Sequence, residues 1–125
     1  MTTTDTGRLG ESLACKHLKK KGYKIVRKNY HASHNELDII AENKQYIVFV
    51  EVKTRSCSSP EELTYGTPAS AVTHSKQRRT IAAACDYLHS VKTEKHPRFD
   101  VIEVILNRDS REPIAINHIE SAFIS

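Results

Sequence analysis

Residues 46–52 constrain the fold more than any other part of the chain, because they are apolar at every position except Glu51. A strand that is apolar on both faces belongs in the middle of a sheet covered on both sides. An ionised carboxylate in such a place costs several kcal/mol unless it is paired or binds a metal ion. The segment therefore predicts a central strand over residues 46–54 whose carboxylate has a partner or a function.

A second β-rich run, residues 36–41, lies just before this segment and predicts the strand that pairs with the central strand. The polar residues 42–45 between the two runs suit a hairpin turn. Because strand side chains alternate between faces, Glu51 and Lys53 project from the same face. Asp38 joins them, facing position 49 or 51, if the hairpin loop has an even number of residues. An odd loop without a bulge turns Asp38 to the other face.

The remaining segments predict two helices and three strands. We expect a helix over 7–21 ended by Gly22, a strand over 23–29, a surface loop over 56–62, a helix from a Thr67-Pro68 cap to about residue 90 with a possible new cap at Thr73, and strands over 99–106 and 114–119. This order predicts an α/β fold, a mixed sheet flanked by helices. Asp100 lies within an apolar strand, where we expect a structural pairing with Arg98; a site residue or a second helix are the alternatives.

Size and composition exclude several classes of protein. A chain of 125 residues has the usual size of one domain, so residues 1–125 are expected to form a single unit. The hydrophobic share of 38% and charged share of 27% exclude collagen-like and largely disordered chains. The longest uninterrupted apolar run is far shorter than the roughly 20 residues that a membrane helix needs. The first residues resemble neither a secretory signal nor a transit peptide, so the cytoplasm is the expected location.

Cysteine and histidine spacing gives no sign of a structural metal. Cys15, Cys57 and Cys85 are far apart and form no CxxC pair, so we expect reduced thiols. His31 and His34 share a segment without an obvious third ligand, which argues against zinc.

Charge is distributed unevenly along the chain. Residues 1–35 carry a net charge of +6, residues 36–70 carry −3 and residues 71–125 carry +1. Two interpretations fit this pattern: an ordinary solvated basic surface, or a rim that binds a polyanion around an acidic pocket. The candidates for phosphate contacts are Arg55, Lys76, Arg78 and Arg79, each of which is equally compatible with a solvated position.

Asp38, Glu51 and Lys53 form the strongest candidate for chemistry. Two carboxylates at a strand end can hold Mg²⁺, and the metal neutralises the phosphoryl group in phosphodiester hydrolysis. Lys53 would position the attacking water or help to deprotonate it. The alternative is an ion-pair ladder of Glu51, Lys53 and Arg55 with no catalytic role. A Gly-rich phosphate loop and a Ser-His-Asp arrangement are both missing from the sequence, which argues against nucleotide hydrolysis and acyl transfer.

Asp38 followed by Glu51-Val52-Lys53 resembles the PD-(D/E)xK nuclease superfamily. Nearly the whole chain is similar to the YraN family of endonuclease-like proteins, related in fold to archaeal Holliday-junction resolvases. The similarity rests on Gly7-Arg8-Leu9-Gly10-Glu11, Gly22-Tyr23, Asn29, Glu36-Leu37-Asp38-Ile39-Ile40, Val48-Phe49-Val50-Glu51-Val52-Lys53-Thr54-Arg55, Gly66, Lys76, Arg98-Phe99-Asp100-Val101 and Ala122-Phe123. Leu37 stands where the superfamily has Pro, and Asn35 where Gly is expected.

The resemblance implies a restriction-endonuclease-like fold and a role for each site residue. Asp38 and Glu51 would be metal ligands, with the Val52 carbonyl as a possible third and Lys53 as the catalytic lysine. Glu11 would complete the metal site, although an exposed acid in the first turn of a helix is the alternative. The cofactor would be Mg²⁺, with Mn²⁺ possible, and the substrate DNA, possibly branched, cleaved by a possible homodimer.

The sequence therefore predicts a structure-selective, Mg²⁺-dependent endodeoxyribonuclease. The main alternative is a nucleic-acid-binding adapter of the same fold with little or no turnover. A third interpretation is a protein-interaction module in which the charged residues form only a structural ion-pair network.

Overall fold

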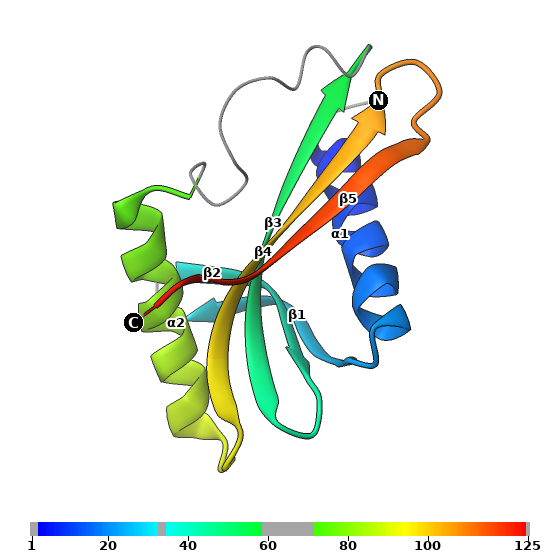
Figure 1. Ribbon diagram of the computed structural model, residues 1–125. Coiled ribbons are helices and arrows are strands. Elements are labelled where there is room, and N and C mark those ends of the chain that lie inside the picture. The colour runs from blue at the N-terminus through cyan, green and yellow to red at the C-terminus, as the bar shows by residue number, and fades with distance from the viewer. Residues whose placement is uncertain (1–2, 33–34, 59–71, 125) are drawn as a thin grey trace.

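The computed structural model describes residues 3–32, 35–58 and 72–124. Two helices and five strands follow one another in these ranges (Figure 1): α1 (Thr3–Lys20), β1 (Lys24–Ala32), β2 (Asn35–Glu42), β3 (Tyr46–Cys57), α2 (His74–Ser90), β4 (His96–Asn107) and β5 (Pro113–Phe123). The strands form one sheet in the order β1-β2-β3-β4-β5. Only β3 and β4 run parallel, while the other neighbours are antiparallel. The predicted α/β class and element order are confirmed, and the mixed sheet is consistent with a restriction-endonuclease-like fold.

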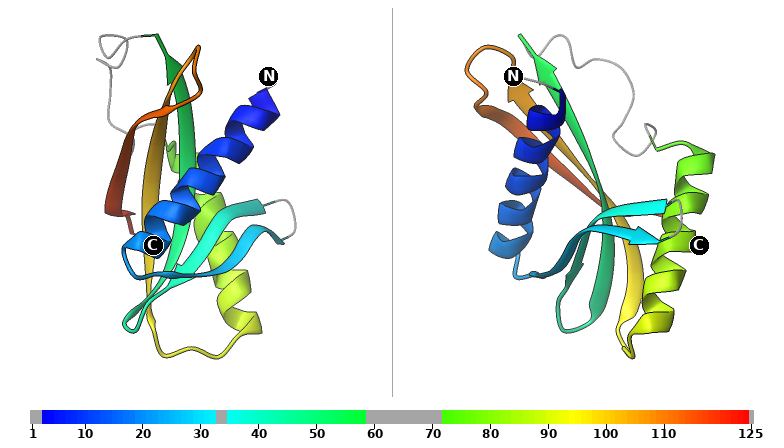
Figure 2. Two further views of the ribbon diagram at one scale, coloured as in Figure 1. Left: turned by 90° about the vertical axis from the view of Figure 1, so that its right-hand side faces the viewer. Right: turned by 180° about the vertical axis from the view of Figure 1, so that it is seen from behind.

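The two helices cover opposite faces of the sheet (Figure 2). Val48 and Val50, at even positions of β3, pack with Leu18 of α1 in one buried cluster. Phe49, at an odd position, packs with Tyr87 of α2 in the other. Both faces of β3 are therefore buried, which is why its sequence is apolar without alternation. None of the helices in the described ranges is long and apolar enough to span a membrane.

The β2–β3 hairpin fixes which residues face each other at the site. Its ladder runs from Glu42–Ile47 to Ile39–Val50, with four residues, 43–46, between the last paired positions. The Asn43 side-chain oxygen accepts hydrogen bonds from the backbone N–H groups of Gln45 and Tyr46 and so closes the turn. This even-numbered connection places Asp38 opposite Glu51 when the register is extended by one residue. The prediction that depended on loop parity is confirmed.

α1 ends as the sequence predicts but begins earlier. Gly22 has a φ of 93°, and its N–H donates to the Lys19 carbonyl while the Tyr23 N–H donates to the Leu18 carbonyl. This is the Schellman arrangement, for which glycine is favoured. The helix starts at Thr3 rather than at residue 7. Gly7 therefore lies inside the helix, and Asp5 occupies its first turn. An acidic residue there is favourable for the helix dipole.

Two predicted boundaries at the β3–α2 connection differ from the structure. The loop predicted over 56–62 is wrong at Ser56 and Cys57, which belong to β3 because they pair with Leu106 and Asn107 of β4. The rest of that loop from residue 59 on, and the Thr67-Pro68 cap, lie outside the described residues. α2 begins at His74 with Thr73 as its N-cap, the position predicted as a possible second cap.

Candidate active site

The candidate site lies where β2 and β3 separate. Their ladder stops at Ile39–Val50, whereas β3 continues alongside β4 as far as Cys57. The N–H of Val52 thus lies beyond the last residue pair of the β2–β3 ladder. It donates instead to Asp38 Oδ2 at 2.8 Å. The Asp38 side chain takes the place of a backbone acceptor, which holds its carboxylate between the two strands.

Asp38 and Glu51 lie against each other in this gap. The Glu51 residue is only 5% exposed. Burial and the neighbouring charge of Glu51 raise the pKa of Asp38 from 3.8 to about 8. Two close carboxylates cannot both be ionised easily, so the pair favours a cation, either a proton or a metal ion.

Two lysines approach the same oxygen of Glu51. Lys53 Nζ, from β3, lies 3.6 Å from Glu51 Oε1, and Lys76 Nζ, from the first turn of α2, lies 3.7 Å from it. Lys53 is therefore placed beside Glu51, as the strand periodicity predicts. Lys76 was expected to contact phosphate, and its place next to Glu51 was not predicted. The Thr73 cap, whose Oγ1 accepts from the Lys76 N–H, fixes the start of α2 at this point.

Glu11 reaches the site from the other side of the sheet. It lines a cavity of about 260 Å³ together with Asp38, Glu51 and Val52. Burial, followed by the charge of Glu36, raises the pKa of Glu11. The three acids that the resemblance names as metal ligands thus border one cavity.

These residues fit Mg²⁺ as an open site rather than as a closed cage. Within the ranges that the structure describes, no three His, Cys, Asp or Glu side chains converge closely enough to hold a metal ion. Mg²⁺ often binds through one or two carboxylates and keeps several waters. Asp38 and Glu51 supply that pair, and the Val52 carbonyl is next to them. A direct bond from Glu11 to the metal stays a prediction.

Of the three arginines predicted to contact phosphate, one is paired with another acid and two are exposed. Arg55 Nε lies 3.0 Å from Glu103 Oε2 on β4, and Asn117 of β5 donates to the other oxygen of Glu103. The ion-pair ladder considered from the sequence therefore exists for Glu51 and Lys53, whereas Arg55 is paired across the sheet. Arg78 and Arg79 are exposed on α2 and available to a large ligand.

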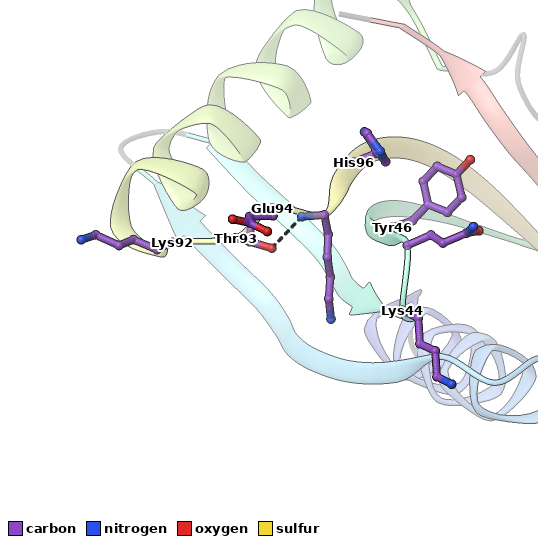
Figure 3. Close-up of a pocket in the computed structure, with 8 residues that line it drawn as sticks. Lys44, Tyr46, Lys92, Thr93, Glu94 and His96 are labelled. Atoms are coloured by element: carbon purple, nitrogen blue, oxygen red, sulfur yellow. Dashed lines mark hydrogen bonds between the residues drawn. The ribbon is translucent and has the colours of Figure 1, made fainter.

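A larger hollow, of about 760 Å³, lies elsewhere on the molecule (Figure 3). It is bordered by the β2–β3 turn and the segment between α2 and β4, at the opposite end of β3 from Lys53. Lys44 and Lys92 extend away from each other in it, and Lys95 is paired with Glu42 at 3.1 Å. The charged groups of this hollow do not converge on one point. We therefore do not take it as the candidate site, although it is larger than the cavity at Asp38 and Glu51.

A second buried acid, Asp100, has a structural environment. It is fully buried and accepts two hydrogen bonds from Arg98, one from the Ser121 N–H and a contact of 2.7 Å with His118 Nε2. Burial alone would raise its pKa, but the hydrogen bonds from His118 and Arg98 outweigh burial and lower it. Arg98 in turn lies over the ring of Tyr23. This geometry agrees with the structural pairing expected from the sequence.

Comparison with known proteins gives a consistent assignment. The model of the uncharacterised protein family UPF0102 matches residues 10–104. A UPF0102 protein of Caldanaerobacter subterraneus subsp. tengcongensis is 42% identical over 94% of this chain and 93% of its own length. A UPF0102 protein of Chloroherpeton thalassium is 41% identical over 98% and 95%, and one of Clostridium perfringens is 45% identical over 94% and 92%. The match spans both Asp38 and Lys53, so the chain that carries this carboxylate pair belongs to the uncharacterised protein family UPF0102.

Proposed function

We propose that the protein is a Mg²⁺-dependent endonuclease that cleaves DNA, with a preference for branched DNA, in the cytoplasm. One observation carries the proposal: two facing carboxylates, Asp38 and Glu51, lie in a strand gap with Lys53 beside them. Two acids that border one cavity, with a lysine paired to one of them, are the groups that metal-assisted phosphodiester hydrolysis requires.

Each residue then has a distinct role. Asp38 and Glu51 hold the cation, and the Val52 N–H keeps Asp38 oriented toward the gap. When bound, Mg²⁺ neutralises charge on the phosphoryl oxygens and lowers the pKa of a coordinated water. Lys53 Nζ positions the attacking water or helps to deprotonate it. Lys76, which pairs with Glu51 in the absence of metal, contacts the scissile phosphate.

Affinity for DNA comes from basic residues outside the carboxylate pair. Arg78 and Arg79 are exposed on the helix that starts at the site. The net charge of +6 in residues 1–35 adds a long-range attraction for a polyanion. Contacts of this kind bind the phosphate backbone and depend little on base sequence. They suit an enzyme that recognises the shape of its substrate.

A second candidate function is supported by the two lysines on Glu51. Lys53 and Lys76 already offset the charge of Glu51 without a metal ion. A site neutralised in this way could serve an adapter that binds nucleic acid without cleaving it. The two functions predict the same binding and differ in turnover.

The decisive experiment is a cleavage assay on four-way junction, flap, single-stranded and duplex DNA with Mg²⁺, Mn²⁺ or EDTA. We expect metal-dependent cleavage that Asp38→Asn, Glu51→Gln and Lys53→Ala each abolish, with DNA affinity kept within a few-fold. Glu42→Gln, an acid of the same strand as Asp38 that pairs with Lys95, is the matched control and should cleave normally. Binding without cleavage of any substrate would favour the adapter, and full activity of Glu51→Gln would exclude the proposed site.

A further inference from the structure

Gly7 lies inside α1, at a position where the packing of the protein does not require a glycine. A glycine within a helix is less favourable than an alanine, so it usually has a packing or functional reason. Gly10 has a packing reason, because Thr54 lies where its Cβ would be. At Gly7 no atom of the described residues lies within 4 Å of an ideal Cβ, so an alanine would fit there without any displacement. The absence of a side chain at position 7 therefore needs a reason other than the fold.

The open space at Gly7 belongs to the cavity of the candidate site. Gly7 lines that cavity together with Asp38 and Glu51. Positions 7, 11, 14 and 18 recur at spacings of three and four residues and so form one face of α1. Ala14 and Leu18, further along this face, are fully buried in the cluster that α1 forms with the sheet. Gly7 thus lies on the sheet-facing side of α1, at the point where close packing gives way to the cavity.

An arginine is bonded to the wall of this cavity next to Gly7. Arg111, from the turn between β4 and β5, donates a hydrogen bond from Nη1 to Thr6 Oγ1 at 2.8 Å. Thr6 lines the cavity beside Gly7. A guanidinium held at this point can pair with a phosphate group that enters the cavity. The surroundings of Gly7 therefore suit a phosphate-bearing ligand.

We propose that a strand of nucleic acid lies against the Gly7 backbone in this cavity, and that the missing side chain at position 7 admits it. Glycine is the residue that lets a ligand approach the backbone most closely. A side chain at position 7 would project into the space that the strand needs and keep it away from Asp38 and Glu51. The inference rests on the proposed function for the site, and it adds the route by which the strand reaches the two acids.

The direct test is protection of a thiol placed at position 7, which requires binding but no cleavage. Gly7→Cys is combined with Cys85→Ser, because Cys85 is exposed whereas Cys15 and Cys57 are buried. The thiol of Gly7→Cys is alkylated with N-ethylmaleimide, with and without saturating four-way junction or single-stranded DNA, and Ca²⁺ replaces Mg²⁺ to suppress cleavage. Because the reactivity of a thiol depends on its exposure, we expect bound DNA to slow the alkylation by about tenfold or more.

Ser12→Cys, again combined with Cys85→Ser, is the matched control on the same helix. Ser12 is exposed and lies about 140° around the helix axis from Gly7. Its alkylation should be the same with and without DNA. Thermal unfolding shows whether each variant is folded, as the open space at position 7 leads us to expect.

A second measurement tests the consequence for cleavage. Gly7→Ala should be at least as stable as the parent but should cleave DNA about tenfold more slowly, and Gly7→Leu about 100-fold more slowly, because the strand is displaced from the acids. Ser12→Leu should cleave at the parent's rate. The affinity of both Gly7 variants for Mn²⁺, followed by electron paramagnetic resonance of the free ion, should equal that of the parent. Slower cleavage together with undiminished stability and cation affinity is a result that a structural role for Gly7 does not produce.

The outcomes separate this inference from the proposed function. If the parent binds no DNA, the proposed function is wrong and the inference is wrong with it. If DNA binds but leaves the alkylation of Gly7→Cys unchanged, or protects Ser12→Cys equally, the inference alone is overturned. Cleavage by Gly7→Leu at the parent's rate would also overturn it. If the parent binds DNA without cleaving it, the protection of Gly7→Cys decides the matter.

Discussion

α1 lies close to Thr54 of β3 at Gly10, and replacing Gly10 with alanine tests how Glu11 reaches the cavity. A Cβ at Gly10 would overlap Thr54 Oγ1 and lie 2.9 Å from Thr54 Cβ and Cγ2. Gly7, one turn earlier in the same helix, has nothing within 4 Å of its ideal Cβ. The two glycines therefore make a matched pair with the same chemistry and opposite surroundings.

The expected free energies of unfolding differ in sign. An alanine inside a helix gains up to about 1 kcal/mol over glycine, so Gly7→Ala should stabilise the protein by that amount or less. Gly10→Ala gains the same helix propensity but must separate α1 from β3, and such overpacking costs typically 1–3 kcal/mol. Subtracting a gain of about 1 kcal/mol leaves a net loss of up to about 2 kcal/mol, equivalent to a melting temperature lower by up to roughly 8 °C for a chain of this size.

The assay is thermal and urea unfolding followed by circular dichroism, with Thr54→Ala as the rescue variant. Thr54→Ala removes Oγ1 and Cγ2, so the double variant Gly10→Ala, Thr54→Ala should recover at least half of the stability lost by Gly10→Ala. Equal stability of Gly10→Ala and Gly7→Ala would refute the close approach of α1 to β3. An additive double variant would refute Thr54 as the obstacle.

Three other predictions follow from the charges in the structure. Because the pKa of Asp38 is raised to about 8, the folded metal-free protein holds a proton that the unfolded chain releases near pH 4. The free energy of unfolding should therefore fall as the pH rises from 5 to 8. Asp38→Asn should flatten this dependence in melting curves taken across that range. Arg78→Ala combined with Arg79→Ala should reduce the slope of log K against log salt by one or two units for a labelled four-way junction, measured by fluorescence anisotropy; an unchanged slope would place DNA elsewhere. Asp100→Asn should destabilise the protein by about 3 kcal/mol in urea, because it leaves Arg98 buried with a neutral partner, and a loss below about 0.5 kcal/mol would contradict that.

That Asp38 and Glu51 share a face could be predicted because it depends on local geometry, whereas the choice between positions 49 and 51 as the partner of Asp38 comes from the observed register. Side chains alternate along a strand, and the parity of a short hairpin loop fixes which side chains share a face. The polar residues 42–45 between the strands predicted a loop with an even number of residues. Lys53 follows from the same alternation. The pattern of one hairpin was therefore sufficient for three residues of the candidate site.

The position of Lys76, and the alignment of Asn29 with Asp38, could not be predicted in the same way. Lys76 reaches Glu51 because α2 packs on the sheet and begins at His74, directly after its Thr73 cap. Lys53 and that cap are about 20 residues apart in the sequence, so no local pattern determines where Lys76 lies relative to the strand. Asn29 lies opposite Asp38 only because the β1–β2 register shifts between Ile25 and Arg27. Alternation of apolar residues does not reveal a shift of this kind.

Arg55 shows the same limit for a charged residue. The sequence offered phosphate or Glu51 as its partner, and the structure pairs it with Glu103, which β4 brings alongside β3. The strand ends were also underestimated where cross-strand pairing, rather than intrinsic preference, extends the strand. Ser56 is an example, since a serine near a loop has weak β propensity and is held by its partner Leu106.

The unequal lengths of the two ladders on β3 have a consequence for local unfolding. β3 pairs with β4 from Tyr46–His96 to Cys57–Asn107, but with β2 only from Glu42–Ile47 to Ile39–Val50. Amide hydrogen exchange in such a sheet divides into cooperative units of different stability, and the β1–β2 hairpin, attached by the shorter ladder, is the unit expected to open first. Its opening would separate Asp38 from Glu51 while β3, β4 and β5 stay folded. The carboxylate pair therefore spans a boundary between two units that unfold separately. A cation held by both acids would join these units, so it should slow amide hydrogen exchange in β2 without altering exchange in β4.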